Sequence, residues 1–417
     1  MVANDLPLPY LESSYLTGIW DFQFGIWDHM AFTPLDYYHL RDLLTDEERM
    51  VQDTVRGFVD DNLMPVIQQC VMDARFPREL IPKLAALNLI GAPYPEKYGC
   101  ANLGSVAYGI INQELERGDS GMRSFVSVQT GLVMYPIFAY GSEAQKDYWL
   151  PKLASGETIG CFGLTEPDFG SNPAGMITRA VDKGSHYVLN GAKAWITNGT
   201  ISDIAIVWAK LEGEVRGFIV ETNRPGFEAP EIKNKFSLRA SVTSDLILQD
   251  VEIPKENILP GVKGLKGPLS CLTQARYGIA WGAVGAAQAV FDEVLQYSLS
   301  RIQFDKPIAS FQLVQEKLTW MATGITTSQL LVYRLAQLKD EKKMRPQQVS
   351  MAKRNNVQMA LDVARAGRDV LGANGISNEY HTFRHMNNLE SVITYEGTHN
   401  MHTLIVGEDL TGIAAYA

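Results

Sequence analysis

The sequence predicts a mainly helical α+β protein in which a small β domain separates two helical regions. Apolar residues recur at intervals of three and four in the first and last thirds of the chain. Between residues 160 and 265, short runs rich in β-branched residues alternate with turn signals. We therefore expect an N-terminal extension over residues 1–41, a helical domain over 42–158, a small β-barrel domain over 159–268 and a four-helix bundle over 269–417.

The first region combines an aromatic-rich segment with a helical pattern. Residues 1–40 have little helical periodicity and would be costly to leave in water, so we expect them to pack on the body or on a neighbouring subunit. Thr45 and Glu48 then have the spacing of a capping box. Further helices are predicted over residues 79–89, 106–117 and 143–153.

The middle region contains strand and turn signals in close alternation. Asn190-Gly191 is a strong hairpin signal, and Asn198-Gly199 and Pro225-Gly226 mark further turns. Several short strands at this spacing indicate a barrel or sandwich, not a parallel α/β sheet. The predicted strands are residues 187–189, 194–197, 204–208, 217–220 and 246–248.

Helical periodicity returns in the last region, and a long helix is expected over residues 347–371. The spacing of its apolar stripes suits antiparallel helices packed as a bundle. The stretch Gly372-Ala-Asn-Gly375 lacks the preceding strand and the spacing of a dinucleotide-binding fingerprint, so we expect it to cap the helix before it.

Composition excludes several classes of protein. The formal net charge of -10 argues against nucleic acid or an anionic membrane as the main partner. The four cysteines are widely spaced without a C-x-x-C pair, so we expect a reducing compartment and no metal site. Neither a membrane span nor a transit peptide is predicted, which favours a cytoplasmic protein, with a mature mitochondrial matrix chain as the alternative.

One carboxylate near the C-terminus draws attention as a candidate catalytic group. Glu396 lies between an aromatic residue and a glycine, after a long helical region. A carboxylate held there can act as a general base, and burial against an apolar substrate would raise its pKa. A solvated loop glutamate is the alternative interpretation.

Five stretches in chain order resemble signatures of the acyl-CoA dehydrogenase family. They are residues 161–173 (CFGLTEPDFGSNP), 195–198 (WITN), 301–304 (RIQF) with Gln312, 371–375 (LGANG) and 395–398 (YEGT). Because they fall in the right order and domains across more than half of the chain, the set is specific. The resemblance implies FAD as cofactor, a CoA thioester as substrate, an electron-transfer flavoprotein as partner and a homotetramer.

Three stretches resemble the branch of that family that oxidises glutaryl-CoA, namely residues 114–124 (ELERGDSGMRS), 271–281 (CLTQARYGIAW) and 395–399 (YEGTH). This resemblance implies α,β-dehydrogenation of glutaryl-CoA with decarboxylation to crotonyl-CoA and CO2. Three alternatives stay open: a non-decarboxylating dehydrogenase, a short-chain acyl-CoA dehydrogenase or oxidase, and a CoA-ester-binding protein without catalysis.

By resemblance, Glu396 is the catalytic base, and Glu116 and Tyr395 assist protonation after CO2 is lost. Arg123 with Ser124 would hold the terminal carboxylate of the substrate, since such a substrate needs a fixed cation. The alternative for Arg123 is a surface arginine paired with Asp119. The remaining implied substrate contacts are Ser127, Val128, Ser171, Arg276 and Gly397.

The resemblance also assigns cofactor contacts. Trp195 would cover the flavin ring, although an ordinary core aromatic is the alternative. Arg301 would hold the FAD pyrophosphate or adenosine of an adjacent subunit, unless it serves its own helix end. The full implied set is Phe162, Leu164, Thr165, Ser171, Trp195, Ile196, Thr197, Arg301, Phe304, Gln312, Leu371, Gly372, Gly375, Thr398 and Asn400.

Overall fold

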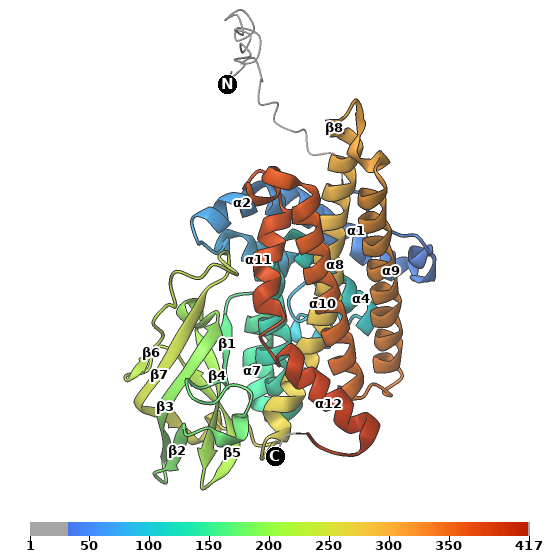
Figure 1. Ribbon diagram of the computed structural model, residues 1–417. Coiled ribbons are helices and arrows are strands. Elements are labelled where there is room, and N and C mark those ends of the chain that lie inside the picture. The colour runs from blue at the N-terminus through green and yellow to red at the C-terminus, as the bar shows by residue number, and fades with distance from the viewer. Residues whose placement is uncertain (1–31, 416–417) are drawn as a thin grey trace, which may run out of the picture. The chain divides into compact units, whose positions relative to one another are not determined.

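The computed structural model describes residues 32–415, and the described residues from Pro34 onward belong to one compact unit. As predicted, the fold is mainly helical, with one β domain between two helical regions along the chain. In space the strands lie on one side of the helices (Figure 1). The expectation for residues 1–40 falls mostly on residues 1–31, which lie outside the described part. No helix within residues 32–415 has the length and apolarity needed to cross a bilayer.

The first helical region begins where the capping box was predicted. The Thr45 hydroxyl accepts from the Glu48 amide at 3.2 Å, and the Glu48 carboxylate accepts from the Thr45 amide at 2.8 Å. The predicted helix over 79–89 is shorter than expected, because Leu87 and Asn88 already form a turn after it. The helices are α1 (Asp46–Phe58), α2 (Met64–Met72), α3 (Ile81–Ala86), α4 (Ser105–Gly118), α5 (Ser120–Ser127), α6 (Tyr135–Tyr140) and α7 (Glu143–Ala154).

Helix α4 is the buried centre of this region and packs against α8 (Lys266–Ser300). The close approach depends on glycines in both helices. A Cβ on Gly109 would lie 2.3 Å from the Trp281 ring, and one on Gly285 would lie 1.8 Å from the Gln113 carbonyl oxygen. Because the backbones meet so closely, side chains near the end of α4 are enclosed on all sides.

The β domain is one seven-stranded sheet in the order β1-β4-β2-β3-β7-β6, with β5 paired to β4. Strand β4 runs parallel to β1 and β2, and the other pairs are antiparallel. Buried aliphatic and aromatic residues from the strands form the core of this domain. The strands are β1 (Gly160–Gly163), β2 (Arg179–Asp182), β3 (His186–Thr197), β4 (Ile204–Leu211), β5 (Glu214–Glu221), β6 (Phe227–Glu228) and β7 (Thr243–Pro254).

The hairpin predicted at Asn190-Gly191 is wrong. Strand β3 runs through this dipeptide with only a shift of register against β7. The Asn190 side chain forms two hydrogen bonds with Asp250 of β7. Its Nδ2 donates to the Asp250 carboxylate at 2.9 Å, and its Oδ1 accepts from the Asp250 amide at 3.0 Å. Gly191 has φ 148°, and a Cβ there would lie 2.4 Å from the Thr178 hydroxyl. The glycine therefore marks a bulge with a close neighbour and not a turn.

In the last region four helices pack against a fifth, α10 (Pro346–Val370), and one of the four, α12 (His399–Thr411), crosses it (Figure 1). Gly372 has φ 60° directly after α10 and Leu371, which confirms the predicted helix end. A short hairpin, β8 (Ile302–Gln303) and β9 (Lys306–Pro307), separates α8 from α9. The helices after α8 are α9 (Gln312–Asp340), α10 (Pro346–Val370), α11 (Thr382–Val392) and α12 (His399–Thr411).

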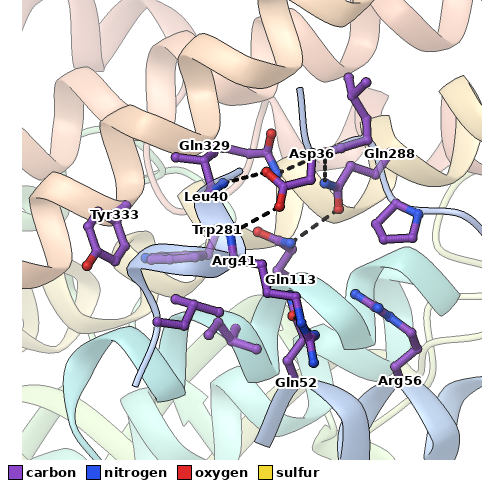
Figure 2. A pocket seen from close by; sticks show the side chains of 14 residues that line it. Asp36, Leu40, Arg41, Gln52, Arg56, Gln113, Trp281, Gln288, Gln329 and Tyr333 are labelled. Atoms are coloured by element: carbon purple, nitrogen blue, oxygen red, sulfur yellow. Dashed lines mark hydrogen bonds between the residues drawn. The ribbon is translucent and has the colours of Figure 1, made fainter. Parts of the chain in front are cut away.

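A pocket lies among α1, α4, α8, α9 and the segment before α1 (Figure 2). Its lining is rich in amide and charged side chains. Figure 2 shows Gln113 hydrogen bonded to Gln288, and Asp36 to the amides of Leu40 and Arg41. None of its lining residues is a site residue predicted from the sequence. The predicted site therefore lies elsewhere in the fold.

Candidate active site

The loop between α11 and α12 presents Glu396. Thr398 caps α12 by accepting from the Met401 amide at 3.2 Å, which fixes the end of the loop. Glu396 has φ 51° and Gly397 has φ 96°. A Cβ on Gly397 would lie 2.8 Å from Nε2 of His402 and 3.2 Å from a guanidinium nitrogen of Arg276. Glycine at 397 is thus required by both backbone and neighbours.

The Glu396 carboxylate is held in a buried, cationic environment. Its Oε2 atom is buried and has no hydrogen-bond partner within residues 32–415. Burial raises the pKa of Glu396, and the charges of Arg123, Arg276 and Lys353 oppose that rise. An ionisable acid with a raised pKa and a free oxygen suits proton abstraction.

Arg123 lies next to this loop in a buried polar cluster. Its Nε donates to Oε2 of Glu116 at 2.5 Å, and an Nη donates to the Tyr395 hydroxyl. Ser120 donates to the other Glu116 oxygen at 2.8 Å. Arg123 and Glu116 are 1% and 0% exposed, so the pair is fully desolvated. The structure thus brings together Glu396, Tyr395, Glu116 and Arg123, as predicted.

The cluster fixes the charge states of its members. Burial raises the pKa of Tyr395 to about 12, so the phenol stays protonated and can donate. Burial lowers the pKa of Arg123, but Glu116 and Tyr395 raise it, and the net result is a raised pKa. Arg123 is therefore a permanent cation beside the loop.

The alternative pairing of Arg123 with Asp119 is wrong, because Asp119 has other partners. One Asp119 oxygen caps α5 by accepting from the Gly121 amide at 2.7 Å. The other accepts from Arg384 at 3.1 Å and from Asn388 at 2.9 Å. Asp119 therefore anchors the start of α5, the helix that carries Arg123.

The other predicted substrate contacts divide into two groups. Ser124, Ser127 and Val128 are buried on the same helical stretch as Arg123, and Arg276 donates from α8 to the Glu396 carbonyl at 2.7 Å. Ser171 lies instead on an exposed part of the loop between β1 and β2.

The residues predicted to contact the flavin ring converge at β1 and β3. The Ala194 amide donates to the Thr165 carbonyl at 2.9 Å. Lys193 joins the same two segments, with its Nζ 3.2 Å from the Leu164 carbonyl and 2.9 Å from Glu166. Phe162, Leu164 and Ile196 are buried, whereas Trp195 has φ 61° at a register shift and is 65% exposed. The core-aromatic alternative for Trp195 is therefore wrong.

The β domain is tied to the helix that leads into the Glu396 loop. The Leu238 amide donates to the Asn388 side chain at 2.9 Å, and the Ser237 hydroxyl lies 2.6 Å from that of Ser391. Leu238 belongs to the connection that enters β7, and β7 pairs with the end of β3 through Thr243 and Thr197. The end of β3 that carries Trp195 is therefore linked, through β7 and the connection before it, to the helix that precedes the Glu396 loop, and we call this region the junction.

A second group of predicted cofactor residues lies far from this junction. Arg301 follows the end of α8, roughly 36 Å of helix from Arg276 at about 1.5 Å per residue. Arg301, Phe304 and Gln312 are exposed there. The 371–375 stretch is near them, since Asn374 donates to the Tyr297 hydroxyl of α8 at 3.2 Å. Thr398 and Asn400 do not belong to this distant group, because they lie at the start of α12, within four residues of Glu396.

Sequence reasoning missed several residues that shape the site. Lys353 falls within the helix predicted over 347–371, Gly282 lies in the last, helical region, and Glu166 belongs to the 161–173 stretch, but the sequence predicts no role for any of them. Each becomes informative only through partners distant in sequence: Lys353 contacts the Glu396 loop, Gly282 contacts Glu116, and Glu166 pairs with Lys193. A lysine on the apolar face of a predicted helix was the one usable signal.

The sequence matches the N-terminal, middle and C-terminal domains of acyl-CoA dehydrogenase over residues 45–157, 161–251 and 262–411. The chain belongs to the acyl-CoA dehydrogenase family, whose members are FAD-dependent oxidoreductases. The predicted family, fold and cofactor are thereby confirmed.

Similar proteins include glutaryl-CoA and short-chain enzymes. The structure of a glutaryl-CoA dehydrogenase from Mycobacterium smegmatis in complex with FADH2 is 50% identical, covers 93% of this chain and 100% of that chain, and superposes with a TM-score of 0.91. The glutaryl-CoA dehydrogenase of Desulfococcus multivorans is 36% identical over 89% of this chain and 98% of its own. The human mitochondrial short-chain specific acyl-CoA dehydrogenase is 34% identical over 88% and 90%, respectively.

Proposed function

We propose that this chain catalyses FAD-dependent α,β-dehydrogenation of glutaryl-CoA, with decarboxylation to crotonyl-CoA and CO2, and passes its electrons to an electron-transfer flavoprotein. One observation carries the proposal: a fully buried arginine lies beside the loop that holds a carboxylate of raised pKa. A permanent cation in a closed acyl pocket suits a substrate with a terminal carboxylate. The similarity to glutaryl-CoA dehydrogenases supports the same substrate.

The residues at the junction fit FAD. Trp195 leaves 65% of its surface exposed although its neighbours Ala194 and Ile196 are buried, as expected for an aromatic face that a planar ring covers. The buried Lys193–Glu166 pair fixes the loop after β1, where backbone groups of Leu164 and Thr165 would meet the ring edge. Bound FAD supplies the acceptor for the hydride that leaves the β-carbon.

The remaining chemistry belongs to the chain. Glu396 takes the proton from the α-carbon, whose acidity rises when the thioester carbonyl is polarised. Arg276 fixes the Glu396 main chain and adds positive charge beside the carboxylate. Arg123 and Ser124 hold the far carboxylate, which fixes the distance between that group and the base.

Decarboxylation follows from the product of oxidation. The second carboxylate then sits on the γ-carbon of an enone, so cleavage of the C–CO2 bond leaves its electron pair delocalised as a dienolate. The proton held by Glu396 returns to the γ-carbon and gives crotonyl-CoA. Tyr395, which stays protonated and whose hydroxyl accepts from Arg123, and Glu116 assist this protonation.

A second copy of the chain would complete the cofactor site. Arg301, Phe304 and Gln312 lie too far from the Glu396 junction to serve a flavin in the same subunit. Phe304 is 87% exposed and Leu313 is 74% exposed, which leaves apolar surface for another protomer. We therefore include a homotetramer in the proposal, with these residues on the FAD of an adjacent subunit.

A short, uncharged acyl chain is the second candidate substrate. Glu116 already neutralises Arg123, so the pocket has less unbalanced positive charge than a lone arginine would give. The similarity to a short-chain specific acyl-CoA dehydrogenase points the same way.

Anaerobic mixing of the purified flavoprotein with glutaryl-CoA or butyryl-CoA tests the proposal. We expect rapid flavin bleaching with glutaryl-CoA and one CO2 released per turnover once an electron-transfer flavoprotein is added. Bleaching with glutaryl-CoA without CO2 would indicate a non-decarboxylating enzyme. Faster bleaching with butyryl-CoA would favour the second candidate, and oxygen consumption would identify an oxidase.

A further inference from the structure

Lys353 contacts the catalytic loop from within the helical bundle. It lies on α10 and is only 1% exposed. Its Nζ donates to the Tyr395 carbonyl at 2.8 Å and to the Gly397 carbonyl at 2.7 Å. Arg276 donates to the carbonyl between them, that of Glu396, at 2.7 Å. Three consecutive carbonyl oxygens around the candidate base therefore each accept from a basic side chain, the buried Lys353 or the half-buried Arg276.

This arrangement fixes an unusual backbone. Glu396 has φ 51°, a conformation that L-residues rarely adopt, and Gly397 has φ 96°. A single amino group that bridges the Tyr395 and Gly397 carbonyls restrains the peptide group before Glu396 and the one after Gly397, and Arg276 restrains the peptide group between them. A buried lysine is costly unless its donors are satisfied, and Lys353 makes two hydrogen bonds to this loop.

We propose that Lys353 is a positioning residue that clamps the carbonyl groups of Tyr395 and Gly397, the residues on either side of Glu396, and so aims the carboxylate and stabilises its ionised form. The proposal rests on the proposed role of Glu396 as the base. Lys353 does not touch the substrate in this assignment. It acts through the loop.

The charges around Lys353 support the electrostatic part. Burial lowers the pKa of Lys353 to about 7, Glu396 opposes that fall, and Arg276 and Arg123 reinforce it. Charged or neutral, the amine retains at least two N–H donors, so the clamp persists in both states. In the charged state Lys353 lowers the pKa of Glu396. The facing histidines add no competing cation, because burial lowers the pKa of His402 to about 3 and also lowers that of His399.

Lys339 offers a matched control. It lies on α9, and burial lowers its pKa to about 8, so it resembles Lys353 in environment. Its ammonium group lies 4.1 Å from the centre of the Tyr277 ring and does not serve the catalytic loop. Replacing either lysine removes a buried amine, but only Lys353→Met removes the clamp.

The test compares holoenzyme variants Lys353→Met, Lys353→Gln and Lys339→Met in rapid anaerobic flavin reduction across pH. In Lys353→Met we expect the limiting rate to fall about tenfold to a hundredfold with little change in KM, because the base is misplaced. The acid limb of its pH–rate profile should shift to higher pH by about one pH unit, because a cation near the Glu396 carboxylate is lost. Lys353→Gln keeps amide donors without charge, so it should recover part of the rate but not the pH limb. Lys339→Met should match the wild type.

A second readout isolates proton abstraction. A 3-thia acyl-CoA analogue can lose its α-proton but has no β-hydrogen to transfer, so its absorbance with the oxidised flavoprotein reports deprotonation alone. The midpoint of its pH titration should rise in Lys353→Met and stay fixed in Lys339→Met. Thermal unfolding of each holoenzyme confirms that the variants are folded.

The outcomes separate this proposal from the proposed function. Wild-type rates and pH limbs in both Lys353 variants would overturn the clamp, and so would equal losses in Lys353→Met and Lys339→Met. If Glu396→Gln reduces flavin at the wild-type rate, the assignment of Glu396 itself is wrong. If Glu396→Gln is inactive while Lys353→Met behaves as wild type, only the clamp is wrong.

Discussion

A Cβ atom on Gly282 would lie 1.9 Å from Oε2 of Glu116. The same atom would lie 3.1 Å from Nε of Arg123. Helix α8 therefore has no side chain at the point where α4 and α5 bring their buried ion pair against it. The Glu116–Arg123 ion pair of the proposed acyl pocket therefore requires glycine at position 282, because any side chain there would displace it.

Gly282→Ala should displace Glu116 and loosen its contact with Arg123. We expect kcat/KM for glutaryl-CoA to fall at least about tenfold, which corresponds to the loss of one good charge-assisted hydrogen bond. The value for butyryl-CoA should fall much less, since that substrate does not use the cation. Gly57→Ala is the matched control, because a Cβ there meets nothing within 4 Å. Equal losses on both substrates would mean a general packing defect.

Arg123→Met should remove the terminal-carboxylate site and leave Glu116 buried without its cation. Breaking one side of a buried pair costs about 3–5 kcal/mol of stability. Arg123→Met with Glu116→Gln should therefore be more stable than Arg123→Met alone, as measured by denaturant unfolding. Both variants should lose activity on glutaryl-CoA far more than on butyryl-CoA. A pair of variants with unchanged substrate preference would remove Arg123 from the specificity site.

Many features of the fold could be predicted from residues that are close together in the sequence. The capping box at Thr45, the glycine stop after α10 and the alternating texture of the middle region each depend on residues close in sequence, and each appears in the structure. Glu396 is a candidate base from its local context, and the resemblance assigns it that role through the short motif around it. These features share one property: the physics that produces them acts over a few residues.

The predictions that are wrong concern residues whose structural partners lie far away in the sequence. Asn190-Gly191 has the composition of a hairpin turn, but β7 and Thr178 impose a bulge instead. Asp119 was a reasonable local partner for Arg123, yet Arg384, 265 residues away, takes its carboxylate. No local pattern distinguishes these outcomes, because tertiary contacts decide them.

Lys193→Met should weaken the flavin end of the site. Lys193 and Glu166 are 0% and 2% exposed and lie 2.9 Å apart, and burial lowers the pKa of Lys193 to about 8. Glu166 also accepts from the amides of Ile177 and Thr178, so the variant leaves an uncompensated charge and loosens the loop after β1. We expect a loss of about 3 kcal/mol in unfolding free energy and a lower flavin content after dialysis. Glu166→Gln with Lys193→Met should restore part of the stability.

Phe304→Ser should weaken assembly before it affects the fold. Phe304 is 87% exposed at the tip of the β8–β9 hairpin, so the single chain loses little by its removal. If a second copy covers it, sedimentation should show a smaller assembly with less bound FAD. Leu410→Ser, also at a residue that is 75% exposed, is the control for lost surface apolarity. Unchanged mass and flavin content in Phe304→Ser would count against the shared cofactor site.

The acid limb of flavin reduction should report Glu396. The base must be ionised, and burial raises its pKa above the usual 4.5, so the rate should fall as pH drops through a value higher than that of a free glutamate. Arg276 opposes the rise, and Arg276→Gln should therefore move the limb to still higher pH. Arg334→Gln, an exposed arginine paired with Glu341, should leave it in place. Rates measured with butyryl-CoA avoid any titration of a terminal carboxylate. If the midpoint of the acid limb does not move in Arg276→Gln, or if it lies at or below pH 4.5, a different group takes the proton.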